Sequence, residues 1–171
     1  MLRSLVGSEM CIRDRRRADR FLDPAHNRGL NPFLAFDPGV DSGHMIAQYT
    51  QAGIVAELKR LTVPSSADSI PSSAMQEDHV SLGWSGARKL RRAVDGLQRV
   101  LAIEILTAAR AIDMREVDAS GGAAAALATL REKVEGPGSD RFLAPEIEEA
   151  VQLVKAGAFV DAVEKAVGEL K

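Results

Sequence analysis

Four consecutive polar residues, Gln76 to His79, form the densest group in this sequence that could do acid–base or hydrogen-bonding chemistry. Ser73 and Gln76 also have the spacing of a capping box, in which a hydroxyl and a carboxamide bind free amides at the start of a helix. We therefore expect Glu77 in a first helical turn, where the helix dipole favours an ionised carboxylate. Such a carboxylate could accept an N–H from a ligand or exchange a proton with it. The alternative is that Gln76, Glu77 and Asp78 only charge a helix start.

The remaining candidates for chemistry are weaker. The three histidines, His26, His44 and His79, are too scattered in sequence to suggest a metal site, and a single cysteine cannot form a zinc cluster. A glycine-rich phosphate loop and an HExxH pair are both absent from the sequence. We expect no metal centre, and we interpret His26 and His44 as loop or helix-cap residues.

One long helix should position the polar group. No proline occurs between Ser73 and about Asp113, and apolar residues recur there at heptad spacing. The repeating positions are Val80, Ala87, Val94 and Leu101, alternating with Leu90 and Leu97 after Gly83. A helix of about 40 residues would exceed the diameter of a domain of this size. We therefore expect it to lie in a bundle that other polypeptide extends.

The other segments also favour helices. The spacing of apolar residues predicts a helix over about 42–62, a short helix over about 123–134, and two helices after Pro145 that Gly157 separates. Residues 17–43 are interpreted as a loop because Pro24, Pro32 and Pro38 interrupt them. No segment has a convincing strand pattern. The predicted fold is all-α, a long-helix bundle with a C-terminal cluster of short helices.

Residues 1–15 fit poorly with the rest of the chain. They show no sustained apolar period, and the string SLVGSEMCIRDR resembles a translated sequencing adapter. We therefore interpret residues 1–15 as a non-native tail and residues 16–171 as the domain.

Composition limits the possible partners. The net charge is −2, which gives no electrostatic support for nucleic-acid binding. No apolar run approaches the roughly 20 residues that span a bilayer, so we expect no membrane partner. One cysteine and no signal-peptide pattern indicate a cytoplasmic protein.

Five segments resemble the bacterial histidine ammonia-lyases of the aromatic amino acid lyase family. SSAMQEDHVS at 72–81 resembles the family's SAxQEDHVSM, with Met75 where many members have Asn and Leu82 where they have Met. The others, in the same order as in the family, are LNPFL at 30–34, DPGVDSGHMIAQYT at 37–50, VLAIEIL at 100–106 and RFLAPEIE at 141–148. The resemblance runs from about Arg16 to the end and corresponds to the C-terminal third of the family chain.

The resemblance implies elimination of ammonia from L-histidine to give trans-urocanate. It implies that Glu77 is catalytic and lies beside the substrate's imidazole, and that Gln76 helps to bind the substrate. The family electrophile, a methylidene-imidazolone made from an internal Ala-Ser-Gly, would belong to a segment that this chain lacks. The resemblance also implies a homotetramer, and an inactive chain when it is alone. Ala119-Ser120-Gly121 repeats the triplet, but the family's D-L-A-P-L does not follow it.

Two alternatives remain open at this point. A related phenylalanine or tyrosine ammonia-lyase or aminomutase would usually have N-Q-D where this chain has Gln76-Glu77-Asp78. A helical module that only oligomerises would have no catalytic residue at all.

Overall fold

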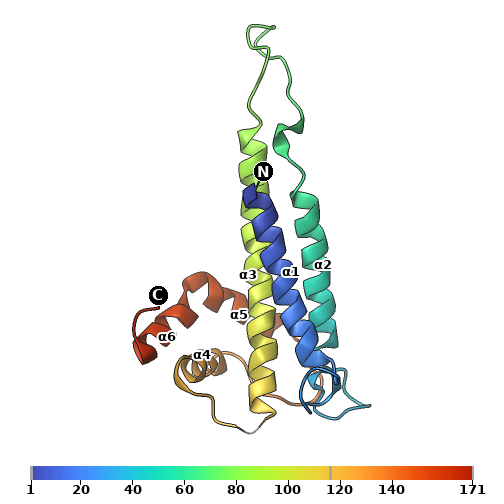
Figure 1. The fold of residues 1–171 in the computed structure, drawn as a ribbon, viewed down its shortest axis with the longest axis vertical. Coiled ribbons are helices and arrows are strands. Elements are labelled where there is room, and N and C mark those ends of the chain that lie inside the picture. Colours follow the sequence, from blue (N-terminus) through green and yellow to red (C-terminus); the bar gives the residue numbers. More distant parts are fainter. Residues whose placement is uncertain (1, 116, 171) are drawn as a thin grey trace.

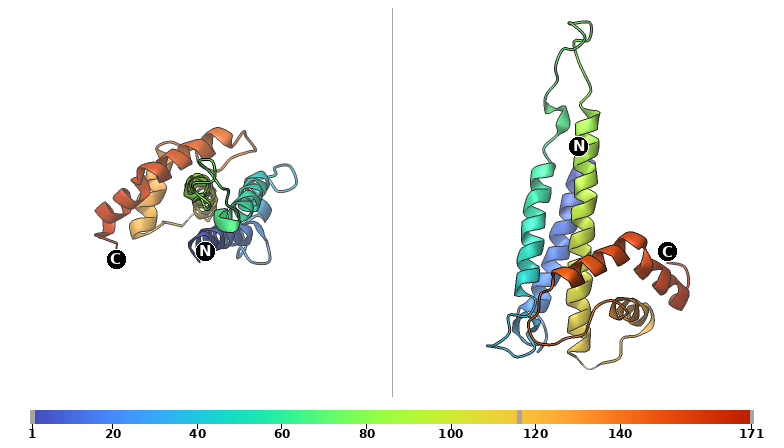
Figure 2. Two further views of the ribbon diagram at one scale, coloured as in Figure 1. Left: turned by 90° about the horizontal axis from the view of Figure 1, so that it is seen from above. Right: turned by 180° about the vertical axis from the view of Figure 1, so that it is seen from behind.

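The computed structural model describes residues 2–115 and 117–170, and these residues fold into helices joined by loops and turns. Three long helices lie side by side, and a cluster of short helices packs on one flank of them (Figures 1 and 2). The helices are α1 (Leu2–Leu22), α2 (Met45–Leu61), α3 (Gly83–Asp113), α4 (Gly121–Arg131), α5 (Ala144–Ala156) and α6 (Ala158–Val167), with 3-10 turns at Pro32–Leu34 and Ser65–Ala67. The predicted all-α fold is confirmed. None of the described helices combines the length and apolarity needed to cross a bilayer.

Helix α1 departs from the prediction. It continues without a break through Leu22, where the sequence pattern indicates a tail and then a loop. Its buried residues, Cys11, Asp14, Ala18 and Leu22, recur every three or four residues, so one face packs against the bundle. The sequence pattern misses this face because Cys, Asp and Ala give little apolar signal. The helical structure of residues 2–15 does not show whether they are native, and their non-native origin stays a prediction.

Helices α2 and α3 are held together by a close approach and by a buried polar bond. A Cβ at Gly96 would lie 2.8 Å from Leu58 Cδ2, so glycine lets the Leu58 side chain of α2 pack closely on α3 at this point. Gln51 is fully buried on α2, and its Nε2 donates to the Val100 carbonyl at 2.9 Å. This bond satisfies a carboxamide donor that would otherwise be buried without a partner.

The start of α2 is fixed by a residue far away in sequence. Asp140 accepts the backbone N–H groups of Ser42 at 2.6 Å and Gly43 at 2.9 Å, and its own N–H donates to Asp41 Oδ1 at 2.9 Å. Gly43 has φ +58, and a Cβ there would lie 2.5 Å from the Phe33 carbonyl oxygen. The sequence pattern predicts a helix start near Ser42, but the helix begins at Met45.

The C-terminal cluster matches its prediction closely. Pro145 lies in the first turn of α5, and Gly157, with φ +74, separates α5 from α6. The cluster packs on the second half of α3 through a shared apolar core of Ala102, Leu106, Ala109, Leu130, Val134, Ala150, Val151 and Phe159. Arg99 and Glu148, 2.9 Å apart, add an exposed ion pair between α3 and α5.

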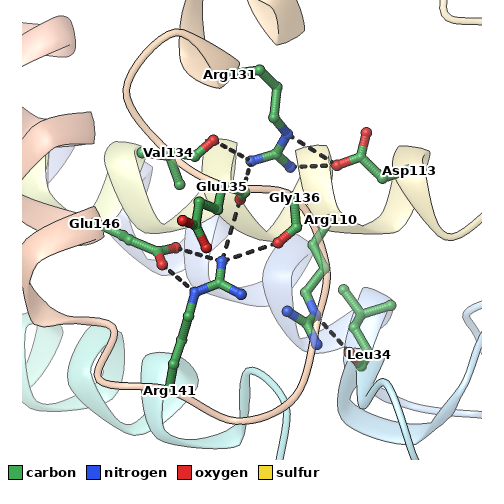
Figure 3. A network of polar contacts seen from close by, with 9 residues as sticks. All are labelled: Leu34, Arg110, Asp113, Arg131, Val134, Glu135, Gly136, Arg141 and Glu146. Carbon is green, nitrogen blue, oxygen red and sulfur yellow. Dashed lines mark hydrogen bonds and ion pairs between the residues drawn. The ribbon is translucent and has the colours of Figure 1, made fainter.

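Three arginines, Arg110, Arg131 and Arg141, make a network of polar contacts near the end of α3 (Figure 3). Arg110 is buried near the end of α3; its Nε donates to the Leu34 carbonyl at 2.7 Å and its Nη2 to the Gly138 carbonyl at 2.9 Å. Arg131 pairs with Asp113, and Arg141 pairs with Glu146 while donating to the Gly136 carbonyl at 3.0 Å. The segment between α4 and α5 is thus fastened to α3 and to the Pro32–Leu34 turn.

The first half of α3 has an uncovered apolar face. Trp84 is 78% exposed and Leu90 65%, and Val94 is also exposed, although the heptad pattern predicts a packed seam at Leu90 and Val94. The buried residues of α3 all lie from Val100 onward. The described residues therefore cover only the second half of the seam.

Candidate active site

The polar group lies in a long loop, not in a helix. Residues 62–82 join α2 to α3 and extend beyond the ends of both helices (Figure 1). Ser73, Ala74 and Met75 have φ values of 53, 53 and 70, in the left-handed region that side-chain-bearing residues rarely adopt. The prediction of a capping box at Ser73 and Gln76 is therefore wrong, because these angles cannot begin a right-handed helix.

The start of α3 differs from the prediction in the same way. The helix begins at Gly83 with Leu82 as its cap residue and without a side-chain cap bond. The helix dipole consequently does not act on Glu77, contrary to the prediction from sequence, and Gln76, Glu77 and Asp78 do not lie in a first helical turn. Glu77 must be positioned by other contacts.

Those contacts come from Ser72. Ser72 N–H donates to the Glu77 carbonyl at 2.8 Å, and Glu77 N–H donates to the Ser72 carbonyl at 3.3 Å. The Ser72 hydroxyl also donates to Glu77 Oε2 at 3.0 Å. We call these three bonds the Ser72–Glu77 clamp. Together with the bond from Gln76 N–H to the Ser73 carbonyl, at 3.2 Å, the clamp closes a tight turn that carries Gln76 and Glu77.

A second set of bonds holds the loop nearer its base. Ser69 Oγ accepts the Val80 N–H at 2.9 Å and donates to the Val80 carbonyl at 3.0 Å. Lys89 Nζ, on the first half of α3, donates to the Val63 carbonyl at 2.7 Å. The two sides of the loop are therefore tied together below the turn, while the side chains of Gln76 and Glu77 are exposed.

A cleft of about 900 Å³ lies beneath the loop, between α1, the end of α2 and the start of α3. It is mainly apolar, and its lining includes Leu61, Val63, His79, Leu90 and Val94. Gln76 and Glu77 do not line this cleft. The structure thus places Gln76 and Glu77 together on an exposed turn, outside this cleft.

His44 is the cap residue of α2, as the sequence suggested, and its side chain is buried, which the sequence did not indicate. Its Nδ1 lies 3.2 Å from Thr107 Oγ1, and the ring is almost fully buried. Burial, followed by the positive charges of Arg110, Arg141 and Arg131 and opposed by Asp140, lowers the pKa of His44 to about 3. The folded protein therefore holds His44 neutral at any pH near 7.

Acidification is expected to destabilise the fold through His44. Its pKa is about 3 when folded, against 6.5 ordinarily, so the unfolded chain binds one more proton between these values. The free energy of unfolding should then fall by about 1.4 kcal/mol per pH unit below 6.5 on account of this residue. Urea titrations at pH 7, 6 and 5 should show a smaller fall for His44→Gln than for the unchanged chain. Equal falls in both proteins would contradict this assignment.

The Ala119-Ser120-Gly121 triplet does not fit the role of an electrophile precursor. Ser120 is the cap residue of α4, its carbonyl accepts the Ala123 N–H at 3.2 Å, and Gly121 is the first helical residue. The triplet is therefore part of an ordinary helix start.

The sequence pattern singles out Gln76 and Glu77 as candidates, but it does not predict the contact between Ser72 and Glu77. Ser72 has no motif of its own, because a hydroxyl that meets a carboxylate five residues later depends on the turn between them. The only hint is the serine- and proline-rich composition of residues 64–73, which favours a loop over a helix.

Comparisons with known proteins give the family of the chain. The profile of the aromatic amino acid lyase family matches residues 5–132. Histidine ammonia-lyase from Streptomyces avermitilis is 59% identical over 91% of this chain and 31% of its own length. The enzyme of the same name from Streptomyces griseus is 54% identical over 98% of this chain and 33% of its own length.

The fold also resembles solved structures of lyase-family proteins. Histidine ammonia-lyase from Trypanosoma cruzi superimposes with a TM-score of 0.88 at 36% identity, covering 95% of this chain and 32% of that one. Tyrosine aminomutase from Streptomyces globisporus superimposes with a TM-score of 0.91 at 32% identity, covering 98% and 32%. The chain spans about a third of the length of the relatives it matches. On the family profile and these similarities, the chain belongs to the aromatic amino acid lyase family.

Proposed function

We propose that this chain is the C-terminal part of a histidine ammonia-lyase, which eliminates ammonia from L-histidine to give trans-urocanate. The observation that carries the proposal is the 54–60% identity to Streptomyces histidine ammonia-lyases over at least 91% of the chain. The structurally similar tyrosine aminomutase is only 32% identical, so the similarity favours histidine over tyrosine as the substrate.

In this proposal Glu77 accepts an N–H of the substrate's imidazole. Ser72 bonds to Oε2, which leaves Oε1 for the ligand, and the exposed turn presents the carboxylate outward. A charged acceptor forms stronger hydrogen bonds than a neutral one, so the carboxylate can both orient the ring and exchange a proton with it. Gln76, on the same turn, would contact the substrate through its carboxamide.

The electrophile of the reaction would come from polypeptide outside this chain. The family's methylidene-imidazolone requires an Ala-Ser-Gly, and the single such triplet here opens helix α4. The pocket around Glu77 would likewise be completed by other polypeptide, since Glu77 is exposed and does not line the cleft beneath the loop. We therefore expect the 171-residue chain to be inactive alone.

We also propose a cytoplasmic homotetramer. The uncovered apolar face of α3, which includes Leu90 and Val94, needs a partner to leave water. Packing of long helices from four subunits, as in the family, would supply one.

Residues 1–15 remain, in our proposal, a non-native tail. In support, the string SLVGSEMCIRDR at 4–15 resembles a translated sequencing adapter.

A hybrid enzyme tests the function. Residues 16–171 of this chain would replace the matching part of Streptomyces griseus histidine ammonia-lyase, which supplies the rest of the polypeptide. We expect this hybrid to form urocanate from histidine within about tenfold of the parent rate and to leave phenylalanine and tyrosine nearly untouched. Light scattering should give the mass of four chains. A hybrid of that mass which deaminates tyrosine in preference to histidine would contradict the proposal.

A further inference from the structure

We propose that Ser72 is a positioning residue, whose hydroxyl fixes the orientation of the Glu77 carboxylate for the substrate. This inference rests on the proposed function, because it assigns Ser72 a role only through Glu77. Ser72 itself would not touch the substrate.

The geometry separates two roles within the Ser72–Glu77 clamp. Its two backbone bonds, at 2.8 and 3.3 Å, fix the position of the Glu77 main chain. They leave the carboxylate free to rotate about the side-chain torsions. The hydroxyl bond to Oε2, at 3.0 Å, is the contact that restrains this rotation, and it engages one carboxylate oxygen only. Oε1 is thereby held in one direction for a ligand.

The surrounding turn gives this restraint a purpose. Three successive residues, Ser73 to Met75, hold left-handed angles, a costly backbone conformation that persists only when its ends are held. An exposed glutamate has several accessible rotamers, and packing does not restrict it here. The clamp joins both ends of the turn and also reaches the carboxylate. Loss of the hydroxyl alone should keep the turn and release the carboxylate.

The chain offers matched variants for a test in the hybrid enzyme. Ser72→Ala removes the hydroxyl, Ser72→Thr keeps it, and Ser73→Ala removes the neighbouring hydroxyl, whereas the bond to Glu77 comes from Ser72. We expect Ser72→Ala to lower kcat by about tenfold, the effect of one hydrogen bond to a charged group. The KM for histidine and the melting temperature should change little. Ser72→Thr and Ser73→Ala should keep most of the activity.

A double-mutant cycle with Glu77→Ala decides how Ser72 acts. If Ser72 works through Glu77, Ser72→Ala has no further effect once the carboxylate is gone. The dissociation constant for urocanate provides a second reading of the cycle when turnover is too slow to measure.

The outcomes separate a failure of the role of Ser72 from a failure of the role of Glu77. An equal loss from Ser72→Ala with and without Glu77, or no loss in either case, would overturn the inference while leaving the proposed function intact. A Ser72→Thr variant as impaired as Ser72→Ala would also overturn it. If Glu77→Ala itself has no effect on urocanate formation, the role of Glu77 fails, and the positioning role of Ser72 fails with it.

Discussion

Glu77→Gln in the hybrid enzyme is expected to lower kcat for histidine by about a hundredfold or more. Glutamine has nearly the same shape and can still accept a bond from Ser72. It lacks the negative charge that strengthens a hydrogen bond from the substrate's imidazole, and it cannot take up a proton. The change therefore removes the proposed chemistry while keeping the turn. The rate of urocanate formation at saturating histidine measures the effect.

Asp78→Asn is the matched control for this prediction. Asp78 is the next residue, it is also exposed, and the same loss of charge occurs there. We expect the kcat of Asp78→Asn to stay within about threefold of the unchanged hybrid. In our account the loss in Glu77→Gln comes from the contact of Glu77 with the imidazole, and not from the lower negative charge of the loop. Near-normal turnover by Glu77→Gln, or equal losses in both variants, would remove Glu77 from the chemistry.

Arg110→Met is expected to lower the free energy of unfolding by about 3 kcal/mol. Methionine keeps much of the buried volume but leaves the carbonyls of Leu34 and Gly138 without their donors. Burial, followed by the nearby charge of Arg141, lowers the pKa of Arg110, so the native arginine already bears a desolvation cost. Methionine does not bear this desolvation cost, so the free energy of unfolding falls by less than the loss of two charge-assisted hydrogen bonds alone would give.

Arg99→Met makes the same substitution on the exposed side of α3. It removes the ion pair with Glu148, which lies partly in water, and should cost less than about 1 kcal/mol. Urea unfolding of the 171-residue chain, followed by circular dichroism, compares the two variants. Equal midpoints for Arg110→Met and Arg99→Met would contradict the structural role given to Arg110.

The sequence is sufficient for the helices whose signals are local. Pro145 at a first turn and Gly157 at a left-handed position each act within a few residues, and both appear in the structure as predicted. The apolar spacing of residues 42–62 also predicts α2 to within a few residues. The exposed face at Leu90 and Val94 agrees with a seam that needs other polypeptide.

Features that depend on distant partners could not be predicted. Helix α1 buries Cys11 and Ala18, whose small side chains give a weak periodic signal, and the contact with the rest of the bundle decides their burial. The start of α2 depends on Asp140, almost 100 residues away. Ser73 and Gln76 have capping-box spacing, but three left-handed residues close a turn instead. The sequence singles out Glu77 as a candidate, but its prediction that Glu77 lies in the first turn of a helix, next to the positive end of the dipole, is wrong.

A structure of the hybrid enzyme with bound urocanate tests the central claim most directly. The account predicts an oxygen of Glu77 within about 3.2 Å of an imidazole nitrogen, with Ser72 Oγ still bonded to the other oxygen. An imidazole ring held by other groups, with Glu77 still turned to water, would contradict it.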